Sequence, residues 1–487
     1  MGRPPAAGAR LSSPVRIAAS SGRGRKRPLL RRAGKARLAG GQGFYGDTPS
    51  SVEGLLAEGV DYLCLEALAE LTLAILQKDR QRDESRGYTR DLPAYLAAAL
   101  PEVAAGRTKV ITNAGGINPT AAAHAAAETA KAAGVSGVKI ATVLGDDLTA
   151  RLDEVSAQTP LAHLDTGAPF AELPAPVLFA SAYLGARPIV DALAQGADIV
   201  ITGRCADAAL FLAPLVHEHG WAWDDWDALA TGMLVGHLLE CSGQTAGGNL
   251  SRHWADVPHP WDLPYPIADV DADGTAVITK PRASGGRVSF DTVRHQLLYE
   301  VHDPARYLTP DVVADFTSAR FEDLGDDRVR VTGVRGAPAT DSYKALLAHH
   351  AGWGGEARVA YSWPEATEKA TTAAAIFAKR VELAGLPVDE WCLELWGVDA
   401  LGGATVPATE VEPPEVVARV AWRCADRATA ALVGREMVPL TLSAPPAGMT
   451  GMGRGAGKPT ELLGIWPTLV EKELVDLRVT VHVEKVT

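Results

Sequence analysis

Short apolar, β-branched runs recur along the first half of the chain, and each is followed by a polar or glycine-rich turn. The clearest are residues 109–112 (Lys-Val-Ile-Thr) and 197–202 (Ala-Asp-Ile-Val-Ile-Thr). Runs without a polar residue at every second position are typical of strands buried on both faces of a sheet. Further strands are predicted at 37–39, 61–65, 138–144 and 176–180, and helices are predicted to begin near residues 48, 67, 119 and 225.

This alternation of strands and helices predicts an α/β domain over residues 37–258, with a mainly parallel sheet and helices on its faces. Residues 259–487 have a different pattern, which predicts a second, α+β domain. Its predicted strands are a hairpin at 267–279 and the segments 328–334, 357–362, 392–396, 439–443 and 478–484, and its predicted helices are 290–301, 365–383 and 414–432. A glycine-rich surface loop is predicted at 449–458.

Charge is distributed unevenly along the 487 residues. The first 37 residues hold 11 Lys and Arg and no acid, which leaves 36 basic and 59 acidic residues, a balance of −23, for the rest. Residues 1–36 are therefore predicted to be a basic, disordered leader, and the acidic body argues against nucleic acid as a partner. Five scattered cysteines indicate a reducing compartment. Because no apolar run is long enough for a membrane, we expect a cytoplasmic protein without a membrane partner.

Polar residues follow the ends of the predicted parallel strands, which is where ligands bind in sheets of this kind. We predict that these residues line one edge of the sheet: Asp47, Glu66, Asn113, Asn118, Asp146, Asp147, Arg204 and Asp207. So many carboxylates and amides at neighbouring strand ends favour an enzyme over a protein that only binds.

Residues 113–119 (Asn-Ala-Gly-Gly-Ile-Asn-Pro) combine a strand end, a glycine turn and a helix N-terminus. The backbone N–H groups of Gly115 and Gly116, together with Asn113 and Arg204, are predicted to bind the anionic oxygen of a carboxylate or thioester. Asn118 is predicted to cap the helix and to contact the same substrate.

Arg204 and Asp207 follow the predicted strand at 197–202. A guanidinium in that position suits a carboxylate or phosphate of the substrate, and Asp207 is predicted to bind substrate beside it. The alternative is an internal ion pair of Arg204 with Asp198 or Asp207.

Proton transfer is assigned to Asp147, with Glu66 and Asp47 as alternatives. Asp146 is predicted to cap the helix that follows. The adjacent carboxylates of Asp146 and Asp147 could instead hold a divalent cation, although the predicted chemistry requires no cofactor.

The predicted helix 225–241 ends in His237, Glu240 and Cys241, which share one helix face. This set is a candidate for catalysis or substrate contact, and a zinc half-site is the alternative. No second His/Cys cluster has metal-ligand spacing, so we predict no structural zinc. Gln244, in the glycine-rich loop that follows, is a further candidate for substrate binding.

Residues 41–46 (Gly-Gln-Gly-Phe-Tyr-Gly) match the G-x-G-x-x-G pattern, and Glu66 lies about 20 residues further on. A dinucleotide-binding oxidoreductase is therefore an alternative. Against it, Phe44 and Tyr45 are bulky where a helix must approach closely, and Asp47 would repel a pyrophosphate. A tight turn that places Asp47 at the sheet edge is favoured.

Several longer segments resemble the acyclic terpene utilisation AtuA family: residues 40–47, 113–119, 145–147, 181–210, 220–232, 236–248 and 296–316. The resemblance covers about residues 36–465. It implies a role in the breakdown of citronellol- and geraniol-like terpenes through branched acids and their acyl-CoA thioesters.

Two classes of function are compatible with these observations. The first is an enzyme that acts on a branched carboxylic acid or its CoA thioester by polarising a carbonyl and moving a proton. The second is a non-catalytic subunit or assembly factor of an acyl-CoA carboxylase-type complex. The predicted partners are a small-molecule substrate and either further copies of the chain or a carboxylase-pathway protein.

Overall fold

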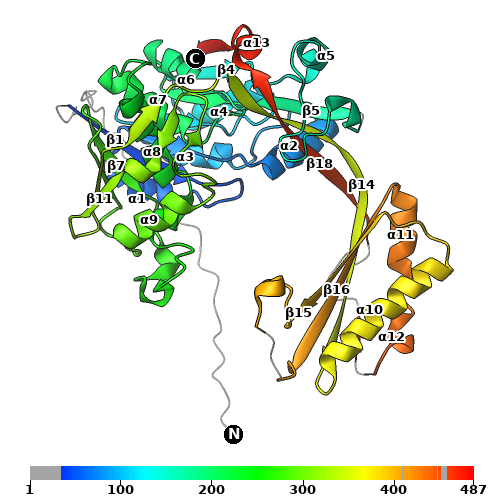
Figure 1. Cartoon of the computed structure of the whole chain (residues 1–487). Helices are drawn as coiled ribbons and strands as arrows, with labels where there is room; N and C mark the ends of the chain where they lie inside the picture. The colour runs from blue at the N-terminus through cyan, green and yellow to red at the C-terminus, as the bar shows by residue number, and fades with distance from the viewer. Residues whose placement is uncertain (1–33, 175, 408–410, 447, 451–457) are drawn as a thin grey trace.

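The computed structural model describes residues 34–174, 176–407, 411–446, 448–450 and 458–487. Residues 1–33 of the predicted leader and 451–457 of the predicted glycine-rich loop lie outside the described residues. Within them the chain forms a large main lobe and a smaller second lobe, joined by long strands (Figure 1). Lys35 and Ala36, which were assigned to the leader, already belong to the first strand.

The main lobe is built on a ten-stranded mixed sheet. Its strand order is β11 (Arg320–Asp323), β12 (Val329–Thr332), β8 (Ala276–Thr279), β7 (Ile267–Asp271), β1 (Lys35–Gln42), β2 (Tyr62–Leu65), β3 (Lys109–Thr112), β6 (Ile199–Thr202), β4 (Lys139–Leu144) and β19 (Thr480–Lys485). The five central strands, from β1 to β4, are parallel, and the outer ones are antiparallel to their neighbours. This confirms the predicted α/β class with a mainly parallel N-terminal sheet.

Helices cover both faces of this sheet, because the central strands are apolar on both sides. Two separate clusters of buried residues form the two cores. The helices of the main lobe are α1 (Ser51–Ala57), α2 (Glu70–Arg82), α3 (Leu92–Ala104), α4 (Pro119–Ala132), α5 (Leu152–Ser156), α6 (Arg187–Ala194), α7 (Ala209–His219), α8 (Trp226–Leu239), α9 (Phe290–Leu298) and α13 (Lys472–Asp476). The core on one face includes residues of α6, α7 and α8, and the other includes residues of α1, α3 and α4.

The main sheet continues across residue 258, where the sequence predicted a domain boundary. The predicted hairpin is present as β7 and β8, and β7 pairs with β1 along Lys35–Ala39. The C-terminal strand β19 closes the other side of the sheet by pairing with β4. The segments on either side of residue 258 therefore share one sheet. A small three-stranded sheet of β13 (Arg335–Ala337), β10 (Val313–Asp315) and β9 (Tyr307–Leu308) packs beside α8.

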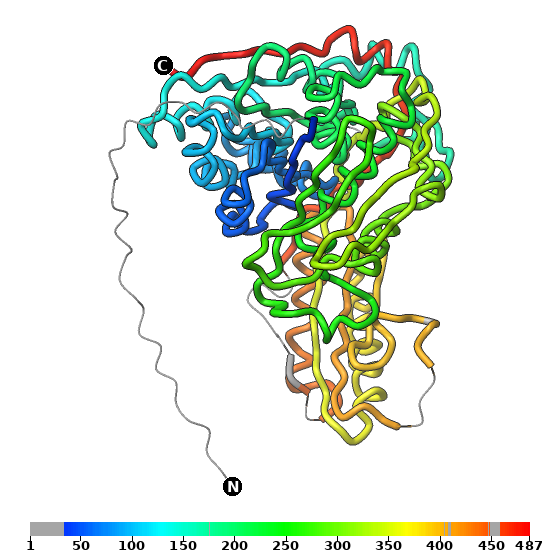
Figure 2. The backbone as a smooth tube through the Cα atoms, turned by 90° about the vertical axis from the view of Figure 1, so that its left-hand side faces the viewer, coloured from blue at the N-terminus to red at the C-terminus, as the bar shows by residue number. Residues whose placement is uncertain are grey.

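The second lobe is organised around one strand of 21 residues, β14 (Ser342–Ser362). Its first half pairs with β18 (Thr460–Glu471) and β5 (Val177–Ala182), and its second half pairs with β16 (Glu415–Cys424) and β17 (Gly448–Thr450). β15 (Glu390–Trp396) completes this sheet, and α10 (Ala366–Leu383), α11 (Arg427–Arg435) and α12 (Leu440–Ser443) supply the helices of this lobe. Figure 2 shows the second lobe as a separate extension below the main lobe.

Two predicted elements of this lobe are wrong. Residues 414–432 were predicted as one helix but form β16 and then α11. In β16 every second residue, including Val416, Ala418, Val420 and Trp422, is buried, so the period of two determines the structure. Residues 439–443 were predicted as a strand but form the short helix α12.

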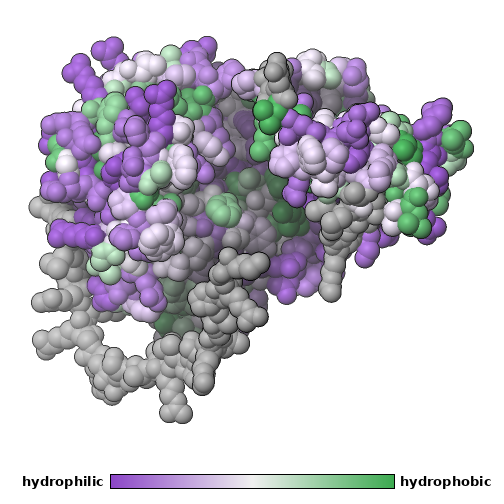
Figure 3. Space-filling model, turned by 90° about the horizontal axis from the view of Figure 1, so that it is seen from below, coloured by the Kyte–Doolittle hydropathy of each residue, from purple (hydrophilic) through white to green (hydrophobic). Residues whose placement is uncertain are grey.

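Hydrophilic side chains cover most of the face seen from below, and hydrophobic groups also reach the surface of the second lobe (Figure 3). Among the described residues, no helix is both long and apolar enough to cross a membrane.

Candidate functional site

Buried polar side chains follow the neighbouring parallel strands β2 and β3. Glu66 comes directly after β2 and Asn113 directly after β3. The Asn113 amide donates from Nδ2 to Glu66 Oε1 at 2.9 Å, and its Oδ1 accepts from the backbone N–H of Ala67 at 2.8 Å. The backbone N–H of Leu68 also donates to Glu66 Oε1, at 2.6 Å. Asn113 therefore orients Glu66, and Glu66 Oε2 has no hydrogen-bond partner within the described part of the chain.

Arg204 follows the next strand, β6, and its guanidinium is almost fully buried. Nη1 donates to the backbone oxygen of Leu68 at 2.5 Å, and Nη2 donates to the carboxylate of Asp207. The guanidinium also lies over the ring of Tyr183, 4.1 Å from its centroid. Nε has no partner among the residues that the structure describes. Of the two predicted internal ion pairs, the one with Asp207 is present, whereas Asp198 pairs with Lys109.

The backbone of Arg204 is held by Asp146. Asp146 Oδ2 accepts from the Arg204 N–H at 2.8 Å and from Ser181 Oγ at 3.0 Å. This buried carboxylate therefore ties together the ends of β4, β5 and β6. The predicted role of Asp146 as a helix cap is wrong, because its side chain binds these two strand ends instead.

Glu66 and Asp207 have raised pKa values for related reasons. Burial is the largest effect on Glu66 and the charge of Asp207 the second, and together they hold the pKa of Glu66 well above its usual range. Burial also raises the pKa of Asp207, to about 6, although Arg204 favours its ionised form. Burial thus favours the protonated form of both carboxyl groups, and Arg204 counters it most directly at Asp207. Two carboxyl groups with different protonation states can act as an acid and a base in one site.

His237 and Glu240 form a buried pair in the last turn of α8. His237 Nδ1 lies 2.9 Å from Glu240 Oε1, and the imidazole packs against the rings of Tyr307 and Phe316. Burial lowers the pKa of His237, but the hydrogen bond and charge of Glu240 raise it by more, so the pKa lies above its ordinary value. His237 Nε2 and Glu240 Oε2 have no partner among the described residues. Burial raises the pKa of Cys241, which keeps its sulfur as a neutral thiol.

A cavity of about 1090 Å³ opens beside these groups. Part of its wall is polar and includes Glu66, Arg204, Asp207 and Glu240. Another part is apolar and includes Leu68, Met233, Leu263, Leu308 and Leu469. A volume of this size accommodates a small molecule with a polar head and a branched apolar tail.

The sequence prediction did not include Tyr183, Glu70 and Lys344, which lie together in the cavity wall. Tyr183 Oη donates to Glu70 Oε1 at 2.6 Å, and Lys344 Nζ donates to the same oxygen at 3.1 Å. Burial raises the pKa of Glu70, but these two hydrogen bonds and the charge of Lys344 lower it to about 2. Lys344 reaches the site because β14 pairs with β5. No signal near Lys344 in the sequence indicates that pairing.

Of two other predicted residues, Asp47 and Gln244, one lies behind the cavity wall and one lies in it. Asp47 accepts hydrogen bonds from Ser242 Oγ and Tyr265 Oη, and both of those residues line the cavity. Gln244 lines the cavity. Its Nε2 donates a hydrogen bond to Gln296 Oε1 at 2.7 Å, and its Oε1 accepts one from Asn249 Nδ2 at 2.9 Å. Asp47 therefore lies behind the wall, and Gln244 is part of it.

The glycine turn after β3 faces away from the cavity. The N–H of Gly116 donates to the Asn113 carbonyl at 3.1 Å. A Cβ on Gly115 would come within 2.4 Å of the Thr202 oxygen, so this glycine permits a close backbone approach. Asn118 caps α4 by accepting from Ala121 N–H at 3.3 Å. These are packing and capping contacts, and none of the three residues lines the cavity.

Asp147 also lies outside the cavity, in a separate groove between the C-terminal end of β4 and helices α2 and α4. Its Oδ1 accepts from the backbone N–H of Thr149 at 2.8 Å. The structure therefore separates Asp147 from Arg204 and Asp207, with which the sequence had grouped it. No cluster of three or more His, Cys, Asp or Glu side chains in the described residues is arranged to hold a metal ion.

Gly41 and Gly43 permit close packing at the end of β1. A Cβ on Gly41 would lie 2.6 Å from a Leu63 methyl group, and one on Gly43 would lie 2.5 Å from the Ser242 nitrogen. The next helix, α1, begins only at Ser51. The arrangement of strand, tight turn and helix N-terminus that a dinucleotide site requires is therefore not formed here.

A comparison with known families identifies one match. The family model described as acyclic terpene utilisation family protein AtuA matches residues 36–481, which confirms the resemblance seen in the sequence. No curated protein and no solved structure matches the chain.

Proposed function

Because the chain belongs to the acyclic terpene utilisation AtuA family, we propose that it is an enzyme of acyclic terpene breakdown. Its substrate would be a branched carboxylic acid or the corresponding CoA thioester, with the carbonyl at the polar wall of the cavity and the hydrocarbon chain along the apolar wall. The reaction would be proton transfer next to that carbonyl. The observation that supports this most directly is that two carboxyl groups with raised pKa values, Glu66 and Asp207, line one cavity and that Arg204 binds Asp207.

In this proposal Glu66 is the acid. Its raised pKa favours the protonated carboxyl group, and both hydrogen bonds from described residues go to Oε1, so Oε2 is the oxygen that would donate to the substrate carbonyl oxygen. Asn113 is the positioning residue that fixes Glu66 through Nδ2. As negative charge develops on the substrate oxygen, this preformed donor stabilises it without reorganisation.

Asp207 is the base. Its carboxylate accepts the proton from the carbon beside the carbonyl, and the bond that forms is the O–H bond of Asp207. Arg204 keeps Asp207 ionised before the transfer. The stack of Arg204 on Tyr183 holds the guanidinium in place. The proton-transfer role that the sequence assigned first to Asp147 thus passes to Asp207, which lines the cavity.

Exchange of the substrate proton with solvent tests this proposal before the final product is known. The protein is incubated in D₂O with citronellol- and geraniol-derived acids and their CoA thioesters, and deuterium next to the carbonyl is followed by mass spectrometry. We expect incorporation with the wild type and a loss of about 100-fold or more in Asp207→Asn. Glu66→Gln tests the acid in the same assay, and we expect it to lower deuterium incorporation as well.

Asp147→Asn is the matched comparison, because it makes the same chemical change in a carboxylate outside the cavity, and exchange should persist. Exchange that depends on Asp147 and survives Asp207→Asn would refute the assignment of the base. Binding of these compounds without exchange at any pH would favour the non-catalytic subunit instead.

A further inference from the structure

The strand β19 leaves one edge of the main sheet open. It is the last strand in the sheet order, and among the described strands it pairs only with β4. Figure 2 shows the C-terminal segment along the outer margin of the main lobe. The N–H of Val486 donates to the Val138 oxygen on the β4 side, at 2.9 Å. Because backbone direction alternates along a strand, the N–H and C=O groups of Val481, Val483 and Lys485 point outward.

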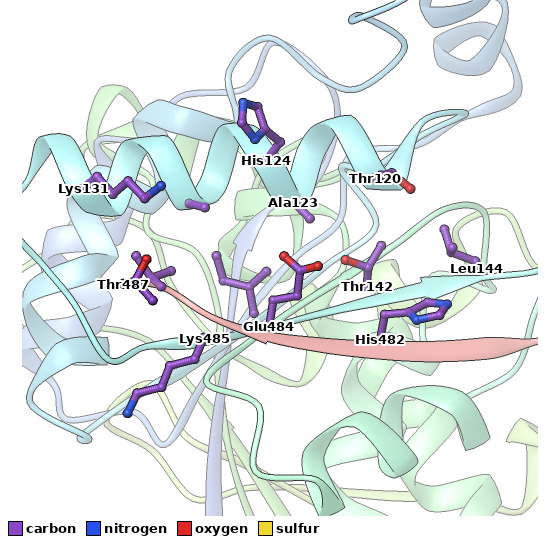
Figure 4. Close-up of a pocket in the computed structure, with 13 residues that line it drawn as sticks. Thr120, Ala123, His124, Lys131, Thr142, Leu144, His482, Glu484, Lys485 and Thr487 are labelled. Carbon is purple, nitrogen blue, oxygen red and sulfur yellow. The ribbon is translucent and has the colours of Figure 1, made fainter.

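A groove lies on each side of this open edge. The first, about 570 Å³, lies between α4 and the face formed by β4 and β19, and its walls include Ala123 and Ala127. Figure 4 shows Glu484 and Thr142 pointing toward α4, while Lys485 points away. The second groove, about 460 Å³, lies on the opposite face and is lined by residues of α6 and by Val481. The edge thus stands between two grooves, and no second strand of the described residues pairs with it.

We propose that this edge is the interface with a second copy of the chain, in which two β19 strands pair antiparallel about a two-fold axis at Val483. In that register the outward backbone groups of Val483 bond to the partner's Val483. His482 then lies opposite the partner's Glu484, and Glu484 opposite the partner's His482. An exposed edge of unpaired backbone groups is a ready template for such pairing.

Charge complementarity selects this register over its neighbours. Only registers that match outward-pointing backbone groups are allowed, so the two-fold axis must pass through a residue and not between residues. An axis at His482 would place two imidazoles opposite each other, and an axis at Glu484 would place two carboxylates opposite each other. The axis at Val483 is the one of these three that brings each imidazole to a carboxylate.

The helices on the far face are compatible with this pairing. α6 packs across β6, β4 and β19, so its axis lies over the middle strand, β4. With strands about 4.8 Å apart, the two α6 helices would lie about 14 Å apart. That spacing is wider than the roughly 8–10 Å of directly packed helices, so the two helices would not clash. The groove beside α6 would face the same helix of the partner.

Two opposite charge changes test the proposal on the full chain. His482 and Glu484 are exposed, so neither substitution disturbs a core. Sedimentation equilibrium is expected to show a dimer for the wild type. The dimer should weaken roughly tenfold or more in Glu484→Lys, which removes the carboxylate opposite the imidazole twice, and in His482→Glu, which places two carboxylates opposite each other twice. The double variant, His482→Glu with Glu484→Lys, restores opposite charges and should regain the dimer.

Glu382→Lys is the control, since it makes the same charge change on the exposed end of α10 in the second lobe. It should leave the dimer unchanged. A protein that stays monomeric at all concentrations would overturn the proposal. So would a dimer that neither single variant weakens, or single-variant losses that the double variant does not reverse.

Discussion

Asn113 and Asp207 show how burial determines what a polar side chain can do. Both follow β-strands in the sequence, and both were candidates for direct contact with substrate. In the structure the side-chain nitrogen of Asn113 donates to Glu66, and its side-chain oxygen accepts from the backbone N–H of Ala67. Asp207 pairs with Arg204 and still lines the cavity. The residue types could be predicted from the sequence. Which of the two positions another side chain and which faces the cavity depends on neighbours from distant segments.

The pKa of Asp207 gives a prediction at this scale. A base must be ionised, so activity should be lost as the pH falls through the pKa of Asp207, about 6. Glu66 must stay protonated, and its raised pKa places a second loss of activity on the alkaline side. The pH profile of kcat/KM in the exchange assay should therefore be bell-shaped. A rate that keeps rising toward acid pH would contradict the assignment of Asp207.

At the scale of elements, α4 is positioned by its cap rather than by a ligand. Asn118 accepts from the N–H of Ala121 and donates from Nδ2 to the backbone oxygens of Glu84 and Arg86. These contacts join the start of α4 to the segment after α2. The helix start was predicted correctly from Asn118-Pro119. Nothing in the local sequence indicated that Asn118 also binds the segment after α2.

Asn118→Ala is expected to lower the free energy of unfolding by about 0.5–2 kcal/mol, the usual cost of removing a helix N-cap. Exchange activity should be unchanged, because Asn118 does not line the cavity. Urea unfolding and the exchange assay together check this. Asn118→Asp keeps the acceptor for the helix N–H but replaces the Nδ2 donor with an oxygen that faces the Glu84 and Arg86 carbonyls, so it should recover little of the stability. A large loss of activity in a stable variant would contradict this prediction and indicate that Asn118 contacts the substrate.

At the scale of the whole molecule, β14 links two lobes with separate cores. Its first half contributes Lys344 to the cavity, and its second half lies under α10 and α11. Phe377 is fully buried at the centre of the second core and packs on Trp391 and Trp422. The cavity and the second core therefore depend on different parts of one strand.

Phe377→Ala should destabilise the second lobe by about 3–5 kcal/mol, the usual cost of removing a buried aromatic ring. Hydrogen exchange should accelerate in β15 and β16, while β2, β3 and β6 keep their protection. Leu383→Ala, at an exposed position of the same helix, is the control and should have little effect. Equal loss of protection in both lobes would show that they unfold as one unit.

The sequence by itself determined the α/β class, most strands of the main sheet and the family. These follow from local periodicity, turn residues and long matching segments, all of which are readable along the chain. It also placed Glu66, Asn113 and Arg204 after neighbouring strands, because parallel strands end at one edge. It failed at residues 414–432, where an alternating pattern was taken for a helix.

Only the tertiary structure decided which of these residues face the cavity. Lys344 and Tyr183 meet through the pairing of β14 with β5, and Glu240 arrives from the end of α8. The same packing buries Glu66 and removes part of the water around Asp207, which raises their pKa values, while it leaves Asp147 in another groove. Contacts between segments far apart in the chain, and the loss of water that they cause, have no signature in local sequence.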